Sequence, residues 1–351
     1  MKVSTIVREQ NSSCFSGVTI MFSKKILLSI ASTLLLSLQS VQPALSNPVI
    51  LLTGQVNNSS KIDMAAKTNV RPKLIVLALH GMAMHGSTFD TLKETLAAEN
   101  ILVVAPDLPG YGMQCLAKAA KCTFRSEASL GFVEEQIKSI KDKHPDVPLI
   151  LLGESLGGAL AIDYASRNAS EINGLILSAP ALSFRALAGL KLAPKLLLSV
   201  LNPATKLQLK AFIEKNSSDN FADGQVVLQD TSSRKTTSLR ELLRIRSFLS
   251  RAKSEVSNLS PDLPILVLHG SADKIISLRG SEFLVNHSTS SNKKLEVFCG
   301  AGHLLLEVKQ PRAEVISAID SWLTDIKQST SVLPSFQTND HNLSNAIVLR
   351  K

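Results

Sequence analysis

Short, uninterrupted apolar runs recur along the middle of the chain, and polar or turn-forming residues bound each of them. Such runs are typical of β-strands that are buried on both faces of a sheet. Between them lie stretches in which apolar residues recur every three or four positions, as in helices that pack on one side. The predicted strands are residues 73–79, 101–105, 149–152, 174–178, 264–268 and 294–298.

Helices are predicted between these strands, at residues 88–100, 128–143, 156–167, 278–286 and 312–326. Regular alternation of strand and helix indicates parallel strands joined by crossover helices. The sequence therefore predicts an α/β fold with a mostly parallel sheet and helices on its faces.

The alternation stops between residues 179 and 262, where leucine-rich stretches carry many Lys and Arg residues. We interpret residues 183–258 as a helical cap, or lid, over the edge of the sheet at which the strands end, because ligands bind at that edge in open α/β folds. A separate helical subdomain with no role in access is the alternative. The remaining predicted boundaries are a lead-in segment at 47–72, a core at 73–182 and 259–327, and a disordered tail at 328–351.

The N-terminal region has the layout of a secretory signal. Lys24 and Lys25 precede an uncharged apolar stretch, residues 26–38, and small residues stand at both recognition positions of a cut before Asn47. Residues 1–46 are therefore predicted to be a signal peptide, with translation starting at Met21, and the protein to be exported to a periplasm or secreted. An uncleaved membrane anchor is the alternative, although the apolar stretch is short for a bilayer.

Composition narrows the classes of partner. Hydrophobic residues make up 44% of the chain, which suffices for a large core, and the net charge of +9 is scattered along it. A nucleic-acid surface needs clustered charge and stacking rings, whereas aromatic residues are only 4% here. No nucleic-acid partner is predicted, peripheral contact with an anionic membrane surface stays open, and the oligomeric state is undetermined.

The chain has four cysteines, of which Cys14 would leave with the signal peptide. In an oxidising compartment Cys115 and Cys122 would close a short disulfide loop. Buried, unpaired thiols are the alternative, since the remaining number is odd. No spacing of Cys and His residues resembles a metal site, and no cofactor is predicted.

Candidate chemistry begins with Gly153-Glu154-Ser155-Leu156-Gly157, which fits G-x-S-x-G. The motif falls between a buried strand and a helix, where a tight turn pushes the serine out above the sheet. Ser155 is therefore the predicted nucleophile, against the alternative of a structural glycine-rich turn.

A serine hydroxyl needs a base, and position selects among the seven histidines. His303 follows the last buried strand and so lies at the same edge of the sheet as Ser155, whereas His80 and His269 each precede a glycine and are interpreted as side chains that fix loops. Asp273 follows the strand at 264–268 at that edge and is the predicted partner of His303. The order Ser, Asp, His along the chain agrees with this assignment.

Two backbone N–H groups are predicted to form an oxyanion hole. Leu156 supplies one at the start of the helix after the nucleophile. Met82 supplies the other from the loop at residues 80–86, which follows the first predicted strand; a plain connecting loop is the alternative. Candidates for lining the substrate pocket are Met84, His85 and Glu154.

Five segments, HGM at 80–82, DLPGYG at 107–112, GESLGG at 153–158, LHGSADKI at 268–275 and GAGHLLLE at 300–307, resemble in this order the monoacylglycerol lipase-like, or lysophospholipase-like, branch of the α/β-hydrolases. The resemblance implies an eight-stranded, mostly parallel sheet with a helical cap after strand six. It also implies hydrolysis of carboxylic esters, often monoacylglycerols or lysophospholipids, with catalytic Ser155, Asp273 and His303 and oxyanion donors at Met82 and Leu156. The usual D-x-R-G-H-G of the family reads Asp107-Leu108-Pro109-Gly110-Tyr111-Gly112 here, which leaves the substrate less defined than the mechanism.

The predicted function is that of a serine hydrolase that cleaves a small-molecule or lipid ester through an acyl-enzyme. An acyltransferase or a peptidase would use the same three residues, and a non-catalytic binding protein would keep the fold without the reaction. The sequence does not separate these alternatives, because they differ in which molecule reaches the acyl-enzyme.

Overall fold

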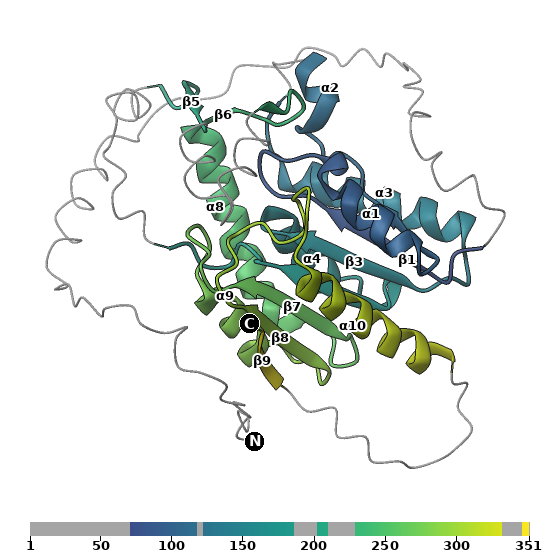
Figure 1. Ribbon diagram of the computed structural model, residues 1–351. Helices are drawn as coiled ribbons and strands as arrows, with labels where there is room; N and C mark the ends of the chain where they lie inside the picture. The colour runs from purple at the N-terminus through teal and green to yellow at the C-terminus, as the bar shows by residue number, and fades with distance from the viewer. Residues whose placement is uncertain (1–70, 118–121, 186–201, 210–228, 332–345, 351) are drawn as a thin grey trace, which may run out of the picture. The chain divides into compact units, whose positions relative to one another are not determined.

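A computed structural model describes residues 71–117, 122–185, 202–209, 229–331 and 346–350 (Figure 1). The predicted signal peptide and nearly all of the predicted lead-in segment lie outside these residues, as does much of the predicted cap. Among the residues that the structure describes, no helix combines the length and the apolar character needed to cross a membrane.

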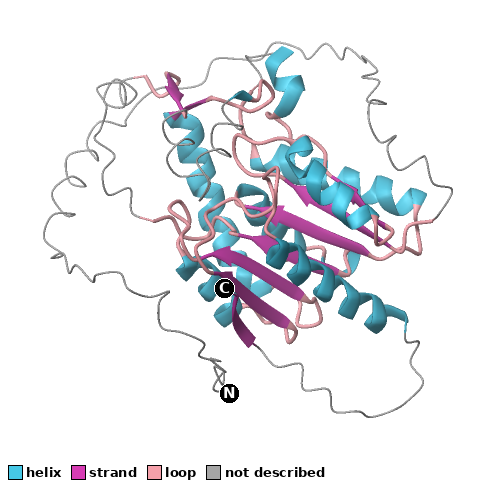
Figure 2. Cartoon of the chain, viewed as in Figure 1, coloured by secondary structure: helices cyan, strands magenta, loops and turns pink. Residues whose placement is uncertain are grey.

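A parallel sheet runs through the middle of the described chain (Figure 2). Its seven strands lie in the order β2-β1-β3-β4-β7-β8-β9, and every neighbouring pair is parallel. Because parallel strands all end at the same edge, the loops that follow them meet there. The strands are β1 (Leu74–Leu79), β2 (Ile101–Val104), β3 (Leu149–Glu154), β4 (Gly174–Ser178), β7 (Ile265–Gly270), β8 (Lys293–Phe298) and β9 (Ala346–Arg350).

Helices cover both faces of this sheet, which is why every residue of its central strands β1, β3, β4 and β7 is buried. Along β1, Ile75 and Leu77 belong to one buried cluster and Leu74 and Val76 to the other, as the twofold period of a strand requires. One cluster includes side chains of α3 (Ser126–Lys143), α4 (Leu156–Ala165), α8 (Leu239–Ser254) and α9 (Leu278–His287). The other includes side chains of α1 (Asp90–Ala97) and α10 (Ala313–Ser331).

Two predictions concern the ends of the fold. Within the described residues the main sheet has seven strands, and nearly all of the lead-in lies outside those residues, so the eighth strand stays a prediction. The tail expected to be disordered from residue 328 includes the last turn of α10 and the edge strand β9. The short apolar run Ala346-Ile347-Val348-Leu349 pairs with β8 in the register that places Ile347 beside Leu295, so the edge of the sheet gives it a structure that it would lack alone.

Between β4 and β7 the chain leaves the sheet. The described part of this insertion consists of a short antiparallel pair, β5 (Lys206–Gln208) and β6 (Thr236–Ser238), followed by α8 and the 3-10 turn η6 (Glu255–Asn258). Ser238 caps α8, its hydroxyl accepting the N–H of Glu241.

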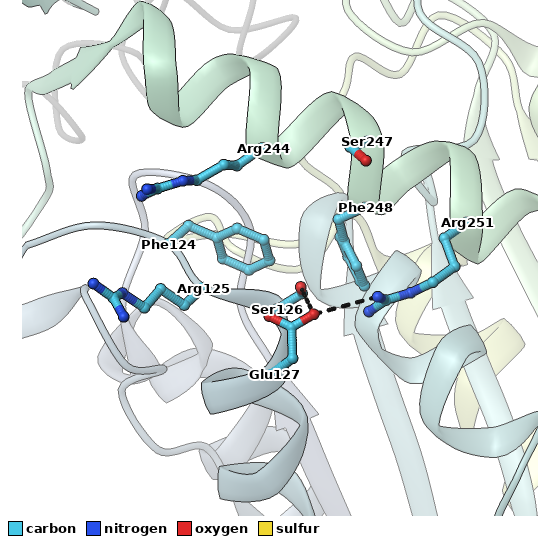
Figure 3. A pocket seen from close by; sticks show the side chains of 8 residues that line it. All are labelled: Phe124, Arg125, Ser126, Glu127, Arg244, Ser247, Phe248 and Arg251. Atoms are coloured by element: carbon cyan, nitrogen blue, oxygen red, sulfur yellow. Dashed lines mark hydrogen bonds and ion pairs between the residues drawn. The ribbon is translucent and has the colours of Figure 1, made fainter. Parts of the chain in front are cut away.

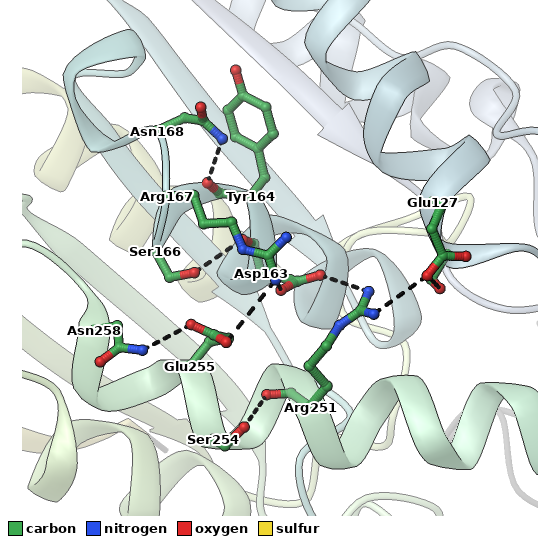
Figure 4. Close-up of polar contacts among 11 residues, drawn as sticks. Glu127, Asp163, Tyr164, Ser166, Arg167, Asn168, Arg251, Ser254, Glu255 and Asn258 are labelled. Atoms are coloured by element: carbon green, nitrogen blue, oxygen red, sulfur yellow. Dashed lines mark hydrogen bonds and ion pairs between the residues drawn. The ribbon is translucent and has the colours of Figure 1, made fainter.

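Charged contacts fasten α8 to the core (Figure 4). Arg251 of α8 donates to the fully buried carboxylate of Asp163 on α4 at 3.1 Å and to Glu127 on α3 at 3.3 Å. Arg167 donates to the other oxygen of Asp163 at 2.6 Å. Two guanidinium groups hold the buried Asp163 carboxylate in place, so α8 is attached firmly to α4, the helix after Ser155.

A disulfide joins Cys115, in the short helix α2 (Gly112–Ala117), to Cys122 after it, with the two Cα atoms 5.1 Å apart. The remaining short elements are the 3-10 turns η3 (Gly86–Phe89) and η5 (Ala169–Glu171).

Candidate active site

Ser155 stands on a sharp turn between β3 and α4. Its backbone has φ 55° and ψ −112°, a left-handed conformation that a residue with a Cβ rarely adopts. Glycines flank it because there is no space for side chains: a Cβ on Gly153 would lie 2.3 Å from the oxygen of Gly157, and a Cβ on Gly157 would lie 2.0 Å from the oxygen of Leu79. The turn therefore holds the hydroxyl above the carboxyl ends of the strands.

His303 reaches this hydroxyl from the loop after β8. Its Nε2 lies 3.0 Å from the Ser155 Oγ, and its Nδ1 lies 2.7 Å from Oδ2 of Asp273. An ionised carboxylate only accepts hydrogen bonds, so Asp273 fixes the proton on Nδ1 and leaves the lone pair of Nε2 facing the serine. The structure thus brings together the three side chains that the sequence selected.

Asp273 follows β7 and is held by its own loop. Its Oδ1 accepts the N–H groups of Ile275 at 2.7 Å and Ile276 at 2.9 Å. Burial alone would raise the pKa of Asp273, but the hydrogen bond from His303, the charges of His303 and His269 and the Ile276 N–H together hold it below its ordinary value. The carboxylate therefore stays ionised beside the imidazole.

Two further buried histidines, His269 and His80, fix loops, as their positions suggested. His269 is fully buried, with its Nδ1 2.9 Å from the Ser281 hydroxyl and its Nε2 3.6 Å from Asp273. Burial lowers the pKa of His269 to about 4, so it is neutral at pH 7. His269 therefore packs against Asp273 but does not replace His303 as the hydrogen-bond partner of that carboxylate.

His80 orients the peptide that joins Gly81 to Met82. The Leu108 N–H donates to its Nε2 at 2.9 Å, which leaves the proton on Nδ1, and Nδ1 donates to the Gly81 carbonyl at 2.9 Å. Burial lowers the pKa of His80 to about 4, which keeps this neutral tautomer. Since the carbonyl of Gly81 is held from behind, the N–H of Met82 in the same peptide points the opposite way.

Two backbone donors border the nucleophile. The N–H groups of Met82 and Leu156 have no hydrogen-bond partner in the part of the chain that the structure describes. Both residues line the same pocket as Ser155 and His303. Unpaired N–H groups beside a nucleophile are what an oxyanion requires.

The pocket over Ser155 is mostly apolar. Met84 belongs to its wall, as expected, and Leu209, Ile245 and Leu249 reach it from the insertion between β4 and β7. The other residues of its wall are Gly81, Met82, Ala83, Leu156, Ala181, Phe184, Ile275 and Leu304.

The two other residues expected at the pocket lie elsewhere. Glu154 is fully buried, and its carboxylate turns away to the hydroxyl of Ser178 and to the backbone after His303. His85 is also buried, with Nε2 2.7 Å from Asp230 and Nδ1 2.9 Å from the Ser87 hydroxyl. The sequence reasoning also missed Glu307, whose side chain touches the loop of Met82. The only signal was an acidic residue directly after the apolar run Leu304-Leu305-Leu306.

A second pocket lies apart from this site, between the start of α3 and α8 (Figure 3). Phe124 and Phe248 form apolar wall, and Arg125, Arg244 and Arg251 surround it. It shares no residue with the pocket over Ser155 and contains no base or nucleophile of the candidate site. Across the described residues, no three His, Cys, Asp or Glu side chains gather as metal ligands would.

A parallel sheet with a strained serine after one strand, an acid after another and a histidine after a third defines an α/β-hydrolase. The family model described as serine aminopeptidase S33 matches residues 70–309, and the chain belongs to that family.

Relatives within the curated proteins are lipases by name. The chain is 28% identical to the monoglyceride lipase of Mus musculus over 74% of its own length and 84% of that protein. It is 26% identical to the monoacylglycerol lipase of Mycolicibacterium smegmatis, over 72% of this chain and 88% of that one. The crystal structure of a monoacylglycerol lipase from Paleococcus ferrophilus matches with a TM-score of 0.59 at 25% identity, over 73% of this chain and 96% of that chain.

A monoglyceride lipase structure from Saccharomyces cerevisiae shares the fold with a TM-score of 0.60 at 23% identity, over 75% of this chain and 87% of that chain. Family and relatives together make the chain a carboxylic ester hydrolase of the monoacylglycerol lipase-like kind.

Proposed function

We propose that this chain hydrolyses lipid esters of the monoacylglycerol type through an acyl-enzyme on Ser155. One observation carries the proposal: the two nitrogens of the His303 ring are engaged at once, Nε2 with the Ser155 hydroxyl and Nδ1 with Asp273. This is the arrangement in which an imidazole removes the proton from a serine that attacks a carbonyl.

In the first half of the reaction His303 takes the proton of Ser155 as the serine oxygen adds to the ester carbonyl. The negative charge that forms on the carbonyl oxygen is stabilised by the N–H groups of Met82 and Leu156. His303 then gives its proton to the departing alcohol, and the acyl group stays on Ser155. Water, deprotonated by His303, releases the acid by the same route.

The wall of the pocket favours a lipid over a peptide. Apart from Ser155 and His303, the described part of this wall consists of apolar residues and Gly81, and none of these residues offers a charge that would recognise a peptide terminus. The family description names a serine aminopeptidase, whereas the curated relatives named above are lipases. A hydrolase for esters with an apolar acyl chain fits the pocket better.

The test is a substrate comparison with one acyl chain and different leaving groups. We expect fatty acid release from 1-monooleoylglycerol with a larger kcat/KM than from oleoyl lysophosphatidylcholine, and no cleavage of an amino-acid p-nitroanilide. Faster cleavage of the anilide would contradict the proposal. Added glycerol or amines would divert the acyl group into new esters or amides if the protein were an acyltransferase.

We also propose that the protein is exported. The disulfide between Cys115 and Cys122 supports an oxidising compartment, and the layout of residues 1–46 supports a cleaved signal. Mass spectrometry of the protein from its native host should give a mature N-terminus at Asn47. Detection of peptides from residues 26–46 in the mature protein would contradict cleavage.

A further inference from the structure

The carboxylate of Glu154, next to the nucleophile in sequence, holds the backbone that follows the catalytic histidine. Its Oε1 accepts the N–H groups of Leu305 at 2.9 Å and Leu306 at 3.2 Å, and its Oε2 accepts the N–H of Glu307 at 2.8 Å. Glu154 is fully buried, so water does not compete for these bonds. The end of β3 is thereby joined to the loop that carries His303.

A second buried carboxyl continues the connection. Oε1 of Glu307 accepts the N–H of Gly81 at 2.6 Å. Gly81 shares a peptide with Met82, and the carbonyl of that peptide is already fixed by His80. The loop of His303 is thereby joined to the loop that offers the Met82 N–H to the nucleophile's pocket.

The surroundings of the two carboxyls are unequal. Glu154 receives the hydroxyl of Ser178 at 2.5 Å in addition to three N–H groups, which suits a carboxylate. Glu307 receives one backbone N–H at Oε1, and the hydrogen bond of the Thr88 hydroxyl to its side chain is the weakest influence on its pKa. Burial and the neighbouring charge of Glu154 raise the pKa of Glu307 well above its ordinary value. Burial also raises the pKa of Glu154, but the bonds to Ser178 and to the backbone oppose it. The four donors around Glu154 favour the carboxylate there, and the fewer donors around Glu307 favour the neutral acid.

We propose that Glu154 and Glu307 are positioning residues that lock together the three loops of Ser155, His303 and Met82. The proposal rests on the proposed function, because it assigns these residues to the same reaction. Neither carboxyl touches the substrate, and each acts through the backbone that it holds. Loss of the Glu307 bond leaves the buried Gly81 N–H unpaired and removes one of two side-chain restraints on this loop, the other being the bond from His80 to the Gly81 carbonyl.

Because Glu154 and Glu307 differ in their hydrogen bonds, the same substitution by Gln should affect activity differently at the two positions, although both are buried. Gln at 307 keeps an oxygen for the Gly81 N–H and is neutral, as the acid is. Gln at 154 places an NH₂ group against backbone N–H donors, because both oxygens of Glu154 are acceptors. Glu307→Gln should therefore be tolerated and Glu154→Gln should not, although both changes are equally small in volume.

The experiment measures kcat and KM on p-nitrophenyl butyrate, whose short acyl chain makes little use of the apolar pocket. We expect kcat of Glu307→Gln within about threefold of the parent. We expect about 10- to 100-fold lower kcat for Glu307→Leu and for Glu154→Gln, with KM nearly unchanged. Inhibition by a boronic acid, which forms a tetrahedral adduct on the serine, should weaken in parallel with kcat.

Glu296→Gln is the matched control, because Glu296 is a fully buried acid on β8 that pairs with Lys294 and Arg350 away from the three loops. It should keep the parental kcat even if it lowers the melting temperature. Equal kcat values for Glu307→Gln and Glu154→Gln would overturn the positioning role. If Glu307→Leu does not fold, the comparison of those two variants decides by itself. A parent protein that is neither active on esters nor labelled by a fluorophosphonate would instead overturn the proposed function.

Discussion

The edge of the sheet that carries Ser155, Asp273 and His303, called the rim below, differs from the insertion between β4 and β7 in how its side chains are buried and held. At the rim, Asp273, His303 and Glu154 are nearly inaccessible, and each is hydrogen-bonded to a loop far away in sequence. The insertion contributes apolar wall to the pocket but leaves Phe184 54% exposed and Leu243 55% exposed.

Polar contacts also attach the described part of the insertion to the rest of the molecule. Arg234 donates to both oxygens of Glu241, and Glu241 accepts the N–H of Phe124 at 2.7 Å. The backbone N–H of Arg234 also donates to the Ala83 carbonyl at 2.8 Å. Under the proposed function, we infer from this difference that the hydrogen-bonded groups of the rim determine the rate of the reaction, whereas the insertion determines which acyl chain fits. Changes at the rim should lower kcat for every ester, and changes in the insertion should affect esters unequally.

Removal of the nucleophile is the largest effect that this comparison predicts. Ser155→Ala should lower kcat/KM by about ten thousand-fold or more for short and long esters alike. The measurement is initial-rate hydrolysis of p-nitrophenyl acetate and decanoate. Ser166→Ala is the control, since its hydroxyl donates to a backbone carbonyl at the end of α4, away from the pocket. Parental rates in Ser155→Ala would contradict the assignment of Ser155 as the nucleophile.

The acid of the rim should come next. Asp273→Asn places an NH₂ group against the ring nitrogen that must carry a proton, so kcat should fall about a thousand-fold or more on every ester. Asp262→Asn is the matched control, because Asp262 is exposed and lies before β7, at the opposite edge of the sheet. Steady-state kinetics on the same two esters is the measurement. Equal rates for the two variants would show that position at the rim is irrelevant.

The support of the oxyanion loop should have a smaller effect. His80→Ala removes the hydrogen bond to the Gly81 carbonyl, and we expect kcat to fall about 10- to 100-fold while KM changes little. His144→Ala, at the end of α3, should leave both constants unchanged. A rise in KM with constant kcat would mean that His80 serves substrate binding instead of the oxyanion.

The insertion should separate long esters from short ones. Leu249→Ala removes apolar contact area from the wall of the pocket. We therefore expect kcat/KM to fall about 5- to 20-fold for the decanoate and by less than about twofold for the acetate. Leu243→Ala on the same helix is the control, because that side chain faces solvent. A Leu249→Ala variant that slows both esters equally would erase the distinction between the two regions.

The smallest effect concerns stability and pH. A raised pKa for Glu307 in the folded protein means that the parental free energy of unfolding falls as pH rises above the ordinary glutamate value, and Glu307→Gln lacks this loss. The variant should therefore become more stable relative to the parent as the pH rises from 5 to 8. Urea unfolding at the two pH values measures the difference. Parallel changes in both proteins would show that Glu307 is ionised.

The sequence predicted best what depends on local order along the chain. Ser155, Asp273 and His303 each follow a recognisable buried strand, and the carboxyl ends of parallel strands meet at one edge. Their approach could therefore be inferred without coordinates. The edge strand β9 could not, because a short apolar run near the C-terminus becomes a strand only when β8 is there to pair with it.

Side chains that act across loops were also beyond the sequence. Glu154 was expected at the pocket because it adjoins Ser155, but alternation along β3 turns it to the other side. Its partners at 305–307 and the contact of Glu307 with Gly81 join segments that no local pattern relates. Buried carboxyls reveal their roles only when the donors around them are known.

The most direct test of the central claim, that Ser155 is activated by His303 held on Asp273, is covalent labelling by a fluorophosphonate followed by peptide mass spectrometry. We predict one adduct per chain, on Ser155, formed about a hundred-fold or more slowly in His303→Ala. An adduct on another serine, or equal labelling rates with and without the histidine, would contradict the claim.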